Sequence, residues 1–452
     1  MAWLGINPTR HGWNGWLSTQ KAIPIGLLDN FTLQATVVSS IVAILREEGQ
    51  LDERLRWLLE SGLDPNDWRL VRENSTGIRY LPLTTQKHAR TGSRERVLDV
   101  ADRCPKSLRI VMNALATRVL FDENNRAIGV EYLQGENLYR AHAAPSAEPG
   151  DRAALFASRE VILAAGAFNT PQLLMLSGVG DRETLDRFGI PVVADLAGVG
   201  RNLQDRYEIG VVNRMNFKAW AAYKGAQFNA KDPQYRAWFK GKSGVYASNG
   251  SALTLFRRSP GAGDLPDQFC MSLLARFSGY RQDYSFDFRD KLNYFTWVVL
   301  KAHTRNRAGE VTLRSSDPRD TPLINFRYFQ EGGDEDLAAV VDGIRFVRRL
   351  SAKLKKYNFI DEAELPGERL QSDDELCEFV RRHAWGHHAS CTCAIGPIER
   401  NGVLASDFRV HGVRGLRVVD ASVFPRIPGF FIASAIYMIG EKAAEVILSS
   451  RD

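Results

Sequence analysis

Two adjacent histidines and two closely spaced cysteines stand in the segment WGHHASCTCAIGP, residues 385–397. Within seven residues they supply four side chains able to bind a metal ion: His387, His388, Cys391 and Cys393. Structural zinc sites usually draw their ligands from separated Cys-x2-4-Cys and His-x3-5-His pairs, and neighbouring histidines point in different directions in most backbones. The pattern therefore predicts no metal site. It leaves a histidine as a candidate general base, with one of the two neighbours facing away from any site and the cysteines as small, buried, unpaired residues.

The segments before this stretch carry clear strand and turn patterns. Residues 108–133 contain two apolar runs around the polar DENNRA, which predicts a β-hairpin with Asn124 and Asn125 in the tight turn. Residues 142–154, HAAPSAEPGDRAA, are small, polar and proline-bearing, and they predict a surface loop.

A strand and a helix are expected next. Residues 161–164 are a continuous apolar run, typical of a strand buried on both faces. Thr170 and Pro171 have the residue types of an N-cap and a first helical residue, and Gly178 is suited to end that helix.

The chain from 206 to 397 is richer in aromatic residues. Residues 293–303 and 309–315 have the composition of strands in an antiparallel sheet. Residues 334–354 place apolar side chains at i, i+3 and i+4 with acids first and bases last, which predicts an amphipathic helix. Residues 415–450 predict a buried strand, an irregular turn and a long helix, an arrangement that receives a phosphate.

Five blocks of the sequence resemble the glucose–methanol–choline oxidoreductase family, in that family's order. The first is GAFNTPQLLMLSGVG at 166–180, which matches a family signature. The others are GVGRNLQDR, GEVTLRSSDPRDTPLINFRYF, HHASCTCAIGP and GLRVVDASVFP, and together the blocks reach across nearly the whole chain. The probability that five blocks in the same order resemble the family by chance is very small.

The resemblance implies an α/β protein that uses FAD to oxidise an alcohol. The expected fold is a discontinuous, Rossmann-like FAD-binding domain plus an α+β substrate domain with an antiparallel sheet. On this basis residues 1–205 are the first part of the FAD-binding domain, 206–395 the substrate-binding domain, and 396–452 the return to the FAD-binding domain.

The family's catalytic histidine stands in a stretch resembling His-Pro-x-Gly-Thr-x-x-Met-Gly, which places His388 at the base. Cys391 replaces the glycine of that stretch and Ile395 the methionine. The family also carries a second His or Asn near the position of Phe431, and no His or Asn occurs from 421 to 441. The substrate oxygen therefore loses a hydrogen bond or receives it from another residue or a water. Phe430 and Phe431 are expected to form an apolar wall that suits a hydrophobic or aromatic alcohol.

Several FAD contacts are implied by the resemblance at small residues. They are Ala116 near the adenine, Ala165 beside the dinucleotide, Asp420 and Ala421 near the pyrophosphate and ribityl chain, and Ala433 by the isoalloxazine. The Gly-x-Gly-x-x-Gly turn with which the family begins, and its βαβ unit, are missing from this sequence. The expectation is thus a chain that starts inside the FAD-binding domain, so that a targeting segment could precede it.

The charge and composition of the chain limit the kinds of partner that it is expected to bind. A formal net charge of +6 is spread along the chain and indicates no nucleic-acid surface, and the longest apolar stretch is too short to span a bilayer. Five cysteines favour a reducing compartment such as the cytoplasm. The partners expected are a small-molecule alcohol and an electron acceptor, oxygen or another. Two alternatives stay open: a non-catalytic remnant unable to hold FAD, and a lyase that uses the histidine with flavin as structure.

Overall fold

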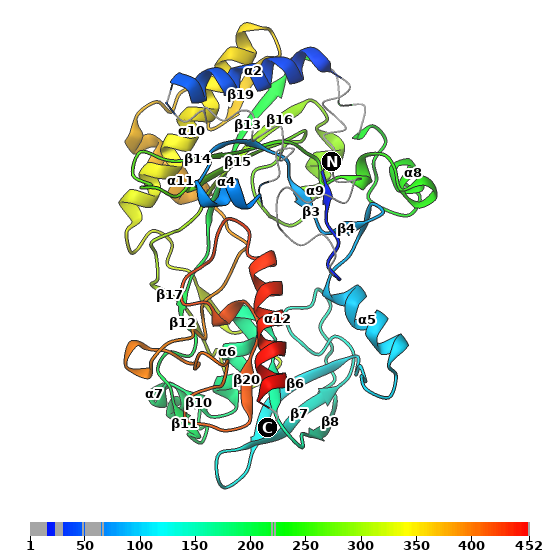
Figure 1. Ribbon diagram of the computed structural model, residues 1–452, viewed down its shortest axis with the longest axis vertical. Helices are drawn as coiled ribbons and strands as arrows, with labels where there is room; N and C mark the ends of the chain where they lie inside the picture. Colours follow the sequence, from blue (N-terminus) through cyan, green and yellow to red (C-terminus); the bar gives the residue numbers. More distant parts are fainter. Residues whose placement is uncertain are drawn as a thin grey trace. The chain divides into compact units, whose positions relative to one another are not determined.

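The computed structural model describes residues 16–22, 30–47, 67–217 and 223–450, with the single residues 49, 65 and 220. The chain divides into two compact units (Figure 1). The first unit comprises Met1–Arg109, Tyr207–Ala302 and Asp334–Trp385. The second comprises Ile110–Arg206, His303–Gly333 and Gly386–Asp452. Each unit is thus assembled from separated parts of the chain.

A six-stranded antiparallel sheet is the centre of the first unit, in the order β19-β13-β16-β15-β14-β2. Its strands are β2 (Gly77–Arg79), β13 (Tyr207–Met215), β14 (Ser251–Arg257), β15 (Gln268–Leu273), β16 (Tyr294–Lys301) and β19 (Ile360–Leu365). β13 and β16 are buried along almost their whole length, and Val211 lies opposite Trp297. The antiparallel sheet expected from residues 293–303 is therefore confirmed.

Helices and short strands complete the first unit. The helices are α2 (Phe31–Glu47), α4 (Trp68–Arg72), α5 (Ser93–Arg103), α8 (Pro233–Gly241), η3 (Val245–Ala247), α9 (Tyr284–Asp290), α10 (Gly333–Lys356) and α11 (Asp373–His383). β1 (Gln20–Lys21) pairs with β3 (Pro82–Leu83), and β4 (Thr85–Gln86) pairs with β5 (Ala89–Arg90). α10 confirms the predicted amphipathic helix, with three acids in its first turn and three lysines in its last.

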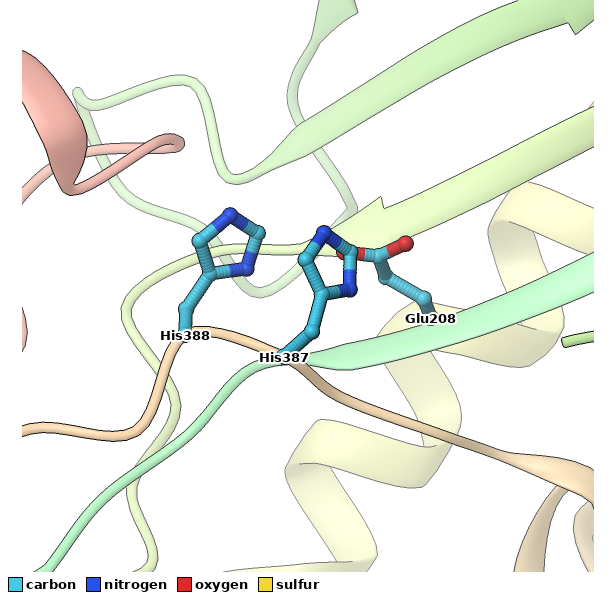
Figure 2. Close-up of side chains that lie close together, drawn as sticks. All are labelled: Glu208, His387 and His388. Carbon is cyan, nitrogen blue, oxygen red and sulfur yellow. The ribbon is translucent and has the colours of Figure 1, made fainter. Parts of the chain in front are cut away.

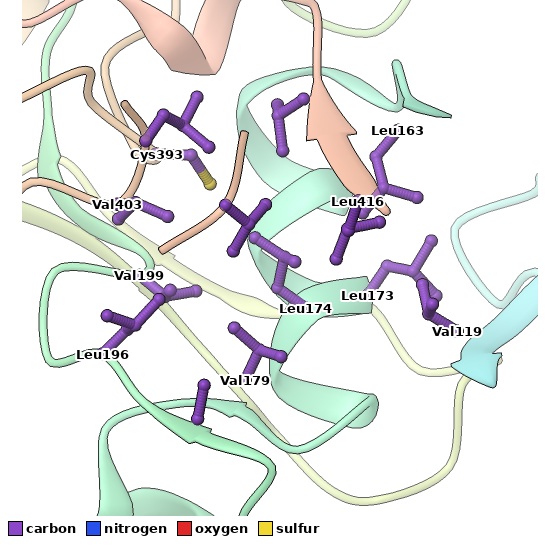
Figure 3. Close-up of a cluster of buried hydrophobic side chains, with 14 of the residues drawn as sticks. Val119, Leu163, Leu173, Leu174, Val179, Leu196, Val199, Cys393, Val403 and Leu416 are labelled. Atoms are coloured by element: carbon purple, nitrogen blue, oxygen red, sulfur yellow. The ribbon is translucent and has the colours of Figure 1, made fainter. Parts of the chain in front are cut away.

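A parallel strand pair organises the second unit. β9 (Val161–Leu163) pairs with β20 (Leu416–Val418), and α6 (Gly166–Leu176) follows β9 directly. The final helix, α12 (Ala433–Ser449), packs Ile439 and Val446 against the same apolar core. Figure 3 shows this core, which gathers side chains from β6, β9, α6, the 393–403 segment and β20. The predicted strand, turn and long helix at the end of the chain are confirmed.

Three smaller sheets surround this core. The strands β6 (Ala114–Phe121), β7 (Ala127–Gln134) and β8 (Asp151–Phe156) form one antiparallel sheet. The strands β12 (Arg201–Leu203), β17 (Gly309–Thr312) and β18 (Leu323–Asn325) form another. β10 (Val179–Gly180) pairs with β11 (Ala194–Asp195) beside α7 (Arg182–Arg187), and η4 (Ile398–Arg400) and η5 (Ala421–Val423) are single 3-10 turns.

The predicted β-hairpin is confirmed by β6 and β7, with Asn125 in the left-handed region at φ 54°. The predicted loop at 142–154 ends too late, because residues from 151 pair with β7 as part of β8. β9 is also less buried than expected. Its central residue, Ile162, is 47% exposed, so one face of this parallel pair is open among the described residues.

The helix start predicted at Thr170 is wrong. α6 begins at Gly166, and both Thr170 and Pro171 lie buried inside it. Its first turn is fixed by Asp420, whose Oδ2 accepts hydrogen bonds from the Gly166 amide and the Thr170 hydroxyl. The expected end is confirmed, since Gly178 follows the helix with φ 83°.

The two units divide the chain differently from the predicted domain ranges. One border between the two units falls after Arg206. Residues up to Arg109, however, belong with the antiparallel sheet, because β2 pairs with β14. Residues 303–333 and 386–395 belong to the other unit, and His388 therefore shares a unit with Asp420 rather than with the six-stranded sheet.

Candidate active site

His388 lies on a loop that backbone hydrogen bonds hold to a neighbouring segment. Ser390 and Gln204 exchange backbone hydrogen bonds of 3.0 and 3.1 Å. The His388 amide donates to Oδ1 of Asp205 over 2.8 Å. His388 is 6% exposed, whereas His387 is exposed. Figure 2 shows the two side chains close together. The two imidazole rings have centroids 4.2 Å apart, so the neighbours differ in exposure while their rings stay close.

An aromatic side chain borders the base. The Phe431 ring lies 5.5 Å from the His388 ring in an edge-on arrangement. Phe430 lies 6.4 Å from the ring of His303. The structure thus places Phe431 beside His388, as the apolar-wall hypothesis requires, and it adds His303 as an aromatic neighbour that the sequence did not suggest. Its position could not be predicted, because residue 303 is more than 120 positions away along the chain.

The surroundings of His388 keep its imidazole neutral. The pKa of His388 is lowered to about 3. Burial is the largest cause, and electrostatic interactions with His387 and Arg206 contribute to the same shift. A neutral imidazole can accept a proton, so above about pH 4 this histidine is in the form that a general base requires.

The segment 204–206 connects the base loop to the turn that carries the phenylalanines. The Gln204 side chain donates to the Pro425 carbonyl over 3.3 Å and accepts from the Ile427 amide over 3.2 Å. The Arg206 guanidinium donates to the Pro428 carbonyl. Gln204 and Arg206 therefore hold the 425–428 turn, while Asp205 between them holds His388. Sequence reasoning missed this, having used GVGRNLQDR solely as a family block.

Cys391 and Cys393 are buried and reduced, as expected. Burial raises the pKa of Cys391 to about 12 and that of Cys393 further, so both thiols stay protonated at neutral pH. Cys391 has φ 78°, a left-handed conformation that favours glycine, and it occupies the position where the resemblance has glycine. Between them, Thr392 donates its hydroxyl to the Ala167 carbonyl over 2.7 Å.

Three of the residues assigned to cofactor binding meet at the ends of β9 and β20. Asp420 accepts from the Gly166 amide at 2.9 Å and the Thr170 hydroxyl at 2.6 Å through Oδ2, and from the Ser422 amide at 2.7 Å through Oδ1. Ala165 immediately precedes this contact. Ala421 is buried, and its carbonyl accepts from the Cys391 amide. The Asp420 carboxylate thus accepts hydrogen bonds from two backbone amides and one hydroxyl of the protein itself.

The other two assigned residues are exposed. Ala116 lies on β6 opposite Tyr132, and Ala433 is the first residue of α12. Ala165 is exposed as well, and a side chain added at Gly166 would meet no atom within 4 Å. Ala165 and Gly166 directly follow β9 of the parallel strand pair, whereas Ala116 lies on an antiparallel strand and Ala433 at a helix start, and the small side chain at each position lets a ligand approach the main chain closely. These positions therefore fit a dinucleotide such as FAD, which they would contact through the backbone.

Two family models match the chain. The amino-terminal and carboxy-terminal models of GMC oxidoreductase match residues 61–208 and 304–440. The chain belongs to the GMC oxidoreductase family. The family match supports a flavoprotein fold with FAD as the cofactor. The predicted family is thereby confirmed.

Curated relatives include a glucose methanol choline oxidoreductase, atC, of Aspergillus terreus, 34% identical over 364 residues. That match covers 76% of this chain and 55% of the relative. An oxygen-dependent choline dehydrogenase of Cronobacter sakazakii is 34% identical over 368 residues, covering 80% of this chain and 61% of the relative. The chain spans less than two thirds of the length of these relatives.

Solved structures agree in fold. A variant of formate oxidase from Aspergillus oryzae, studied for FAD modification, superposes with a TM-score of 0.77 at 26% identity. The match covers 97% of this chain and 74% of that protein. The expected class, a mixed α/β protein of the FAD-dependent type, is confirmed. Among the helices in the described part of the chain, none is long and apolar enough to cross a membrane.

Proposed function

We propose that this chain acts in the FAD-dependent oxidation of an alcohol, with His388 as the general base. The observation that carries the proposal is a buried, neutral imidazole on an anchored loop beside Phe431. The choline dehydrogenase relative supports an alcohol as the class of substrate. Bound FAD would supply the acceptor for the hydride that leaves the alcohol carbon.

His388 would take the hydroxyl proton as that hydride leaves. A positioned general base contributes about 10²–10⁴-fold to a rate, and this is the contribution that we assign to His388. Phe431, 38% exposed, would pack against the substrate carbon chain and exclude water on that side of the base. We therefore propose an apolar or aromatic primary alcohol as the substrate.

Proton acceptance here depends on the same burial that keeps His388 neutral. The protonated imidazole is disfavoured by desolvation and by the positive charge of Arg206. The proton should thus be held briefly and passed on to water or to the next group. His388 is consequently present in its neutral form, and its protonated form is disfavoured.

The test is a spectrum of the purified chain with and without added FAD, followed by anaerobic addition of benzyl alcohol or choline. We expect bound flavin to be bleached by benzyl alcohol more readily than by choline, and His388→Ala to abolish the bleaching while flavin stays bound. A chain that binds no flavin would support the non-catalytic remnant instead. Bound flavin that no alcohol reduces, with cyanohydrin cleavage intact, would support the lyase.

A further inference from the structure

One buried carboxylate lies at the centre of the hydrogen bonds that fix the base loop. Asp205 is 5% exposed and accepts three hydrogen bonds. Its Oδ1 accepts from the amides of His388 and Arg206, each over 2.8 Å. Its Oδ2 accepts from the Tyr328 hydroxyl over 2.9 Å. Both carboxylate oxygens therefore accept hydrogen bonds, and all three donors belong to the second unit.

The space around this carboxylate is closely filled. A side chain at Gly386 would place its Cβ 2.3 Å from Oδ2 of Asp205 and 2.5 Å from the Tyr328 oxygen. Glycine at 386 is therefore what lets the carboxylate reach the base loop. The Asp205 backbone is held too, since the Thr304 hydroxyl donates to its carbonyl over 2.7 Å. The carboxylate is thus fixed from several directions before it holds His388.

We propose that Asp205 is the positioning residue of the base, and that it acts by holding the His388 backbone so that the imidazole stays buried against Phe431. The inference rests on the proposed function of His388. It assigns a role to the aspartate of GVGRNLQDR that sequence reasoning left without one. A base displaced by about 1 Å loses on the order of 10²-fold in rate, so a hydrogen bond to its backbone has a measurable effect on the reaction.

The role is geometric rather than electrostatic. Desolvation raises the pKa of Asp205, while its hydrogen bonds oppose that rise. The groups that act on the His388 charge are His387 and Arg206. An asparagine at 205 keeps an oxygen for the two amides and places its amide group against the Tyr328 hydroxyl, whose oxygen can accept. Asp205→Asn should therefore keep the loop in place, and Asp205→Ala should release it.

The first experiment observes the histidine itself and needs no flavin. The chain is labelled with [13Cε1]histidine, which gives eight signals for its eight histidines. His388→Gln identifies the His388 signal, and His411, whose Nε2 lies 2.9 Å from the Gly396 carbonyl in the same unit, serves as the internal reference. Each signal is followed from about pH 3 to about pH 8, the range in which histidines titrate.

In the unchanged chain the His388 signal should be displaced by the Phe431 ring and should not titrate near pH 6.5. Asp205→Ala should remove the displacement and raise the His388 pKa by more than one unit, with His411 unchanged. Asp205→Asn should keep the original signal. The proposal is overturned if Asp205→Ala leaves the His388 signal in place, or if Asp205→Asn behaves like Asp205→Ala.

A second variant covers the case in which Asp205→Ala disturbs the whole unit and moves His411 as well. Tyr328→Phe removes one hydrogen bond to Oδ2 and keeps the ring, and it should shift the His388 signal in the same direction while His411 stays fixed. A His388 signal unaffected by Tyr328→Phe would then overturn the proposal.

The flavin-loaded chain gives an independent measurement. Asp205→Ala should lower kcat at least tenfold with KM changed by less than about threefold, as expected when only the base is misplaced. In a His388→Ala background, adding Asp205→Ala should have no further effect, because a residue that acts through the base has nothing left to position. Additive losses would overturn the inference. A kcat that His388→Ala does not lower would instead overturn the proposed function and leave the NMR result standing.

Discussion

The substitution Asp420→Asn tests whether Asp420 stabilises the fold. The family resemblance implied that this residue contacts FAD. In the folded chain the carboxylate links the first turn of α6 to the turn after β20 through Gly166, Thr170 and Ser422. The asparagine keeps one oxygen for the Ser422 amide. Its NH2 group faces the Gly166 amide, which is also a donor, so that partly buried amide loses its acceptor.

The magnitude follows from those contacts. A hydrogen bond to a charged group contributes about 1.5–3 kcal/mol, and a buried donor left without a partner costs about 1–3 kcal/mol. Because the contacts are neighbours and do not add fully, we expect Asp420→Asn to lower the free energy of unfolding by about 3 kcal/mol. The matched control is Thr170→Ser, which keeps the hydroxyl and should cost about 1 kcal/mol for the lost methyl group.

The assay is urea denaturation followed by circular dichroism, with hydrogen exchange of peptides from α6 to identify the unit that opens. Two units can unfold in separate transitions, so the exchange measurement assigns the change to the second unit. An Asp420→Asn chain within about 0.5 kcal/mol of the unchanged chain, the usual scatter of surface substitutions, would refute the structural role.

Three further outcomes are expected in the same denaturation assay. Gly178→Ala should cost about 3 kcal/mol, since φ is 83° and its Cβ would lie 2.3 Å from a carbonyl oxygen; Gly440→Ala, in open space on α12, should instead stabilise by about 0.5–1 kcal/mol. Because the folded His388 pKa of about 3 lies below the ordinary 6.5, the unfolded chain binds the proton first, and stability should fall by about 1.4 kcal/mol per pH unit from pH 6.5 toward 3; His388→Gln should remove that part of the slope. Glu160→Gln should cost about 2 kcal/mol, because it breaks a paired charge on the fully buried Arg417, while equal stability would show that the pair contributes nothing.

Local patterns were sufficient wherever a segment's own residues decide its structure. The apolar run of β16, the hairpin turn at Asn125 and the charge-ordered α10 were all predictable, because periodicity and turn chemistry act over a few residues. The place of the first 109 residues was not, since β2 pairs with β14 and nothing local records that pairing.

The start of α6 shows the same limit at a single residue. Thr170 followed by Pro171 has the residue types of a helix start, yet the helix begins four residues earlier because Asp420 holds the Gly166 amide from 254 positions away. The candidate site likewise has one part that the sequence predicted and one part that it did not. His388 was found through a resemblance in its own segment, whereas the contact with Asp205 joins residues 183 positions apart and required the fold.

Asp205 and Asp420 are chemically alike, and what each one holds distinguishes them. Both are buried carboxylates that accept hydrogen bonds from backbone amides of a distant segment. Asp420 fixes the start of a helix, so its loss should lower the free energy of unfolding and leave the His388 titration unchanged. Asp205 fixes the loop of the base, so its loss should change the His388 titration and the rate more than the stability. Measuring both quantities in both variants therefore decides which carboxylate serves the fold and which serves the reaction, since a purely structural Asp205 would give the same pattern as Asp420.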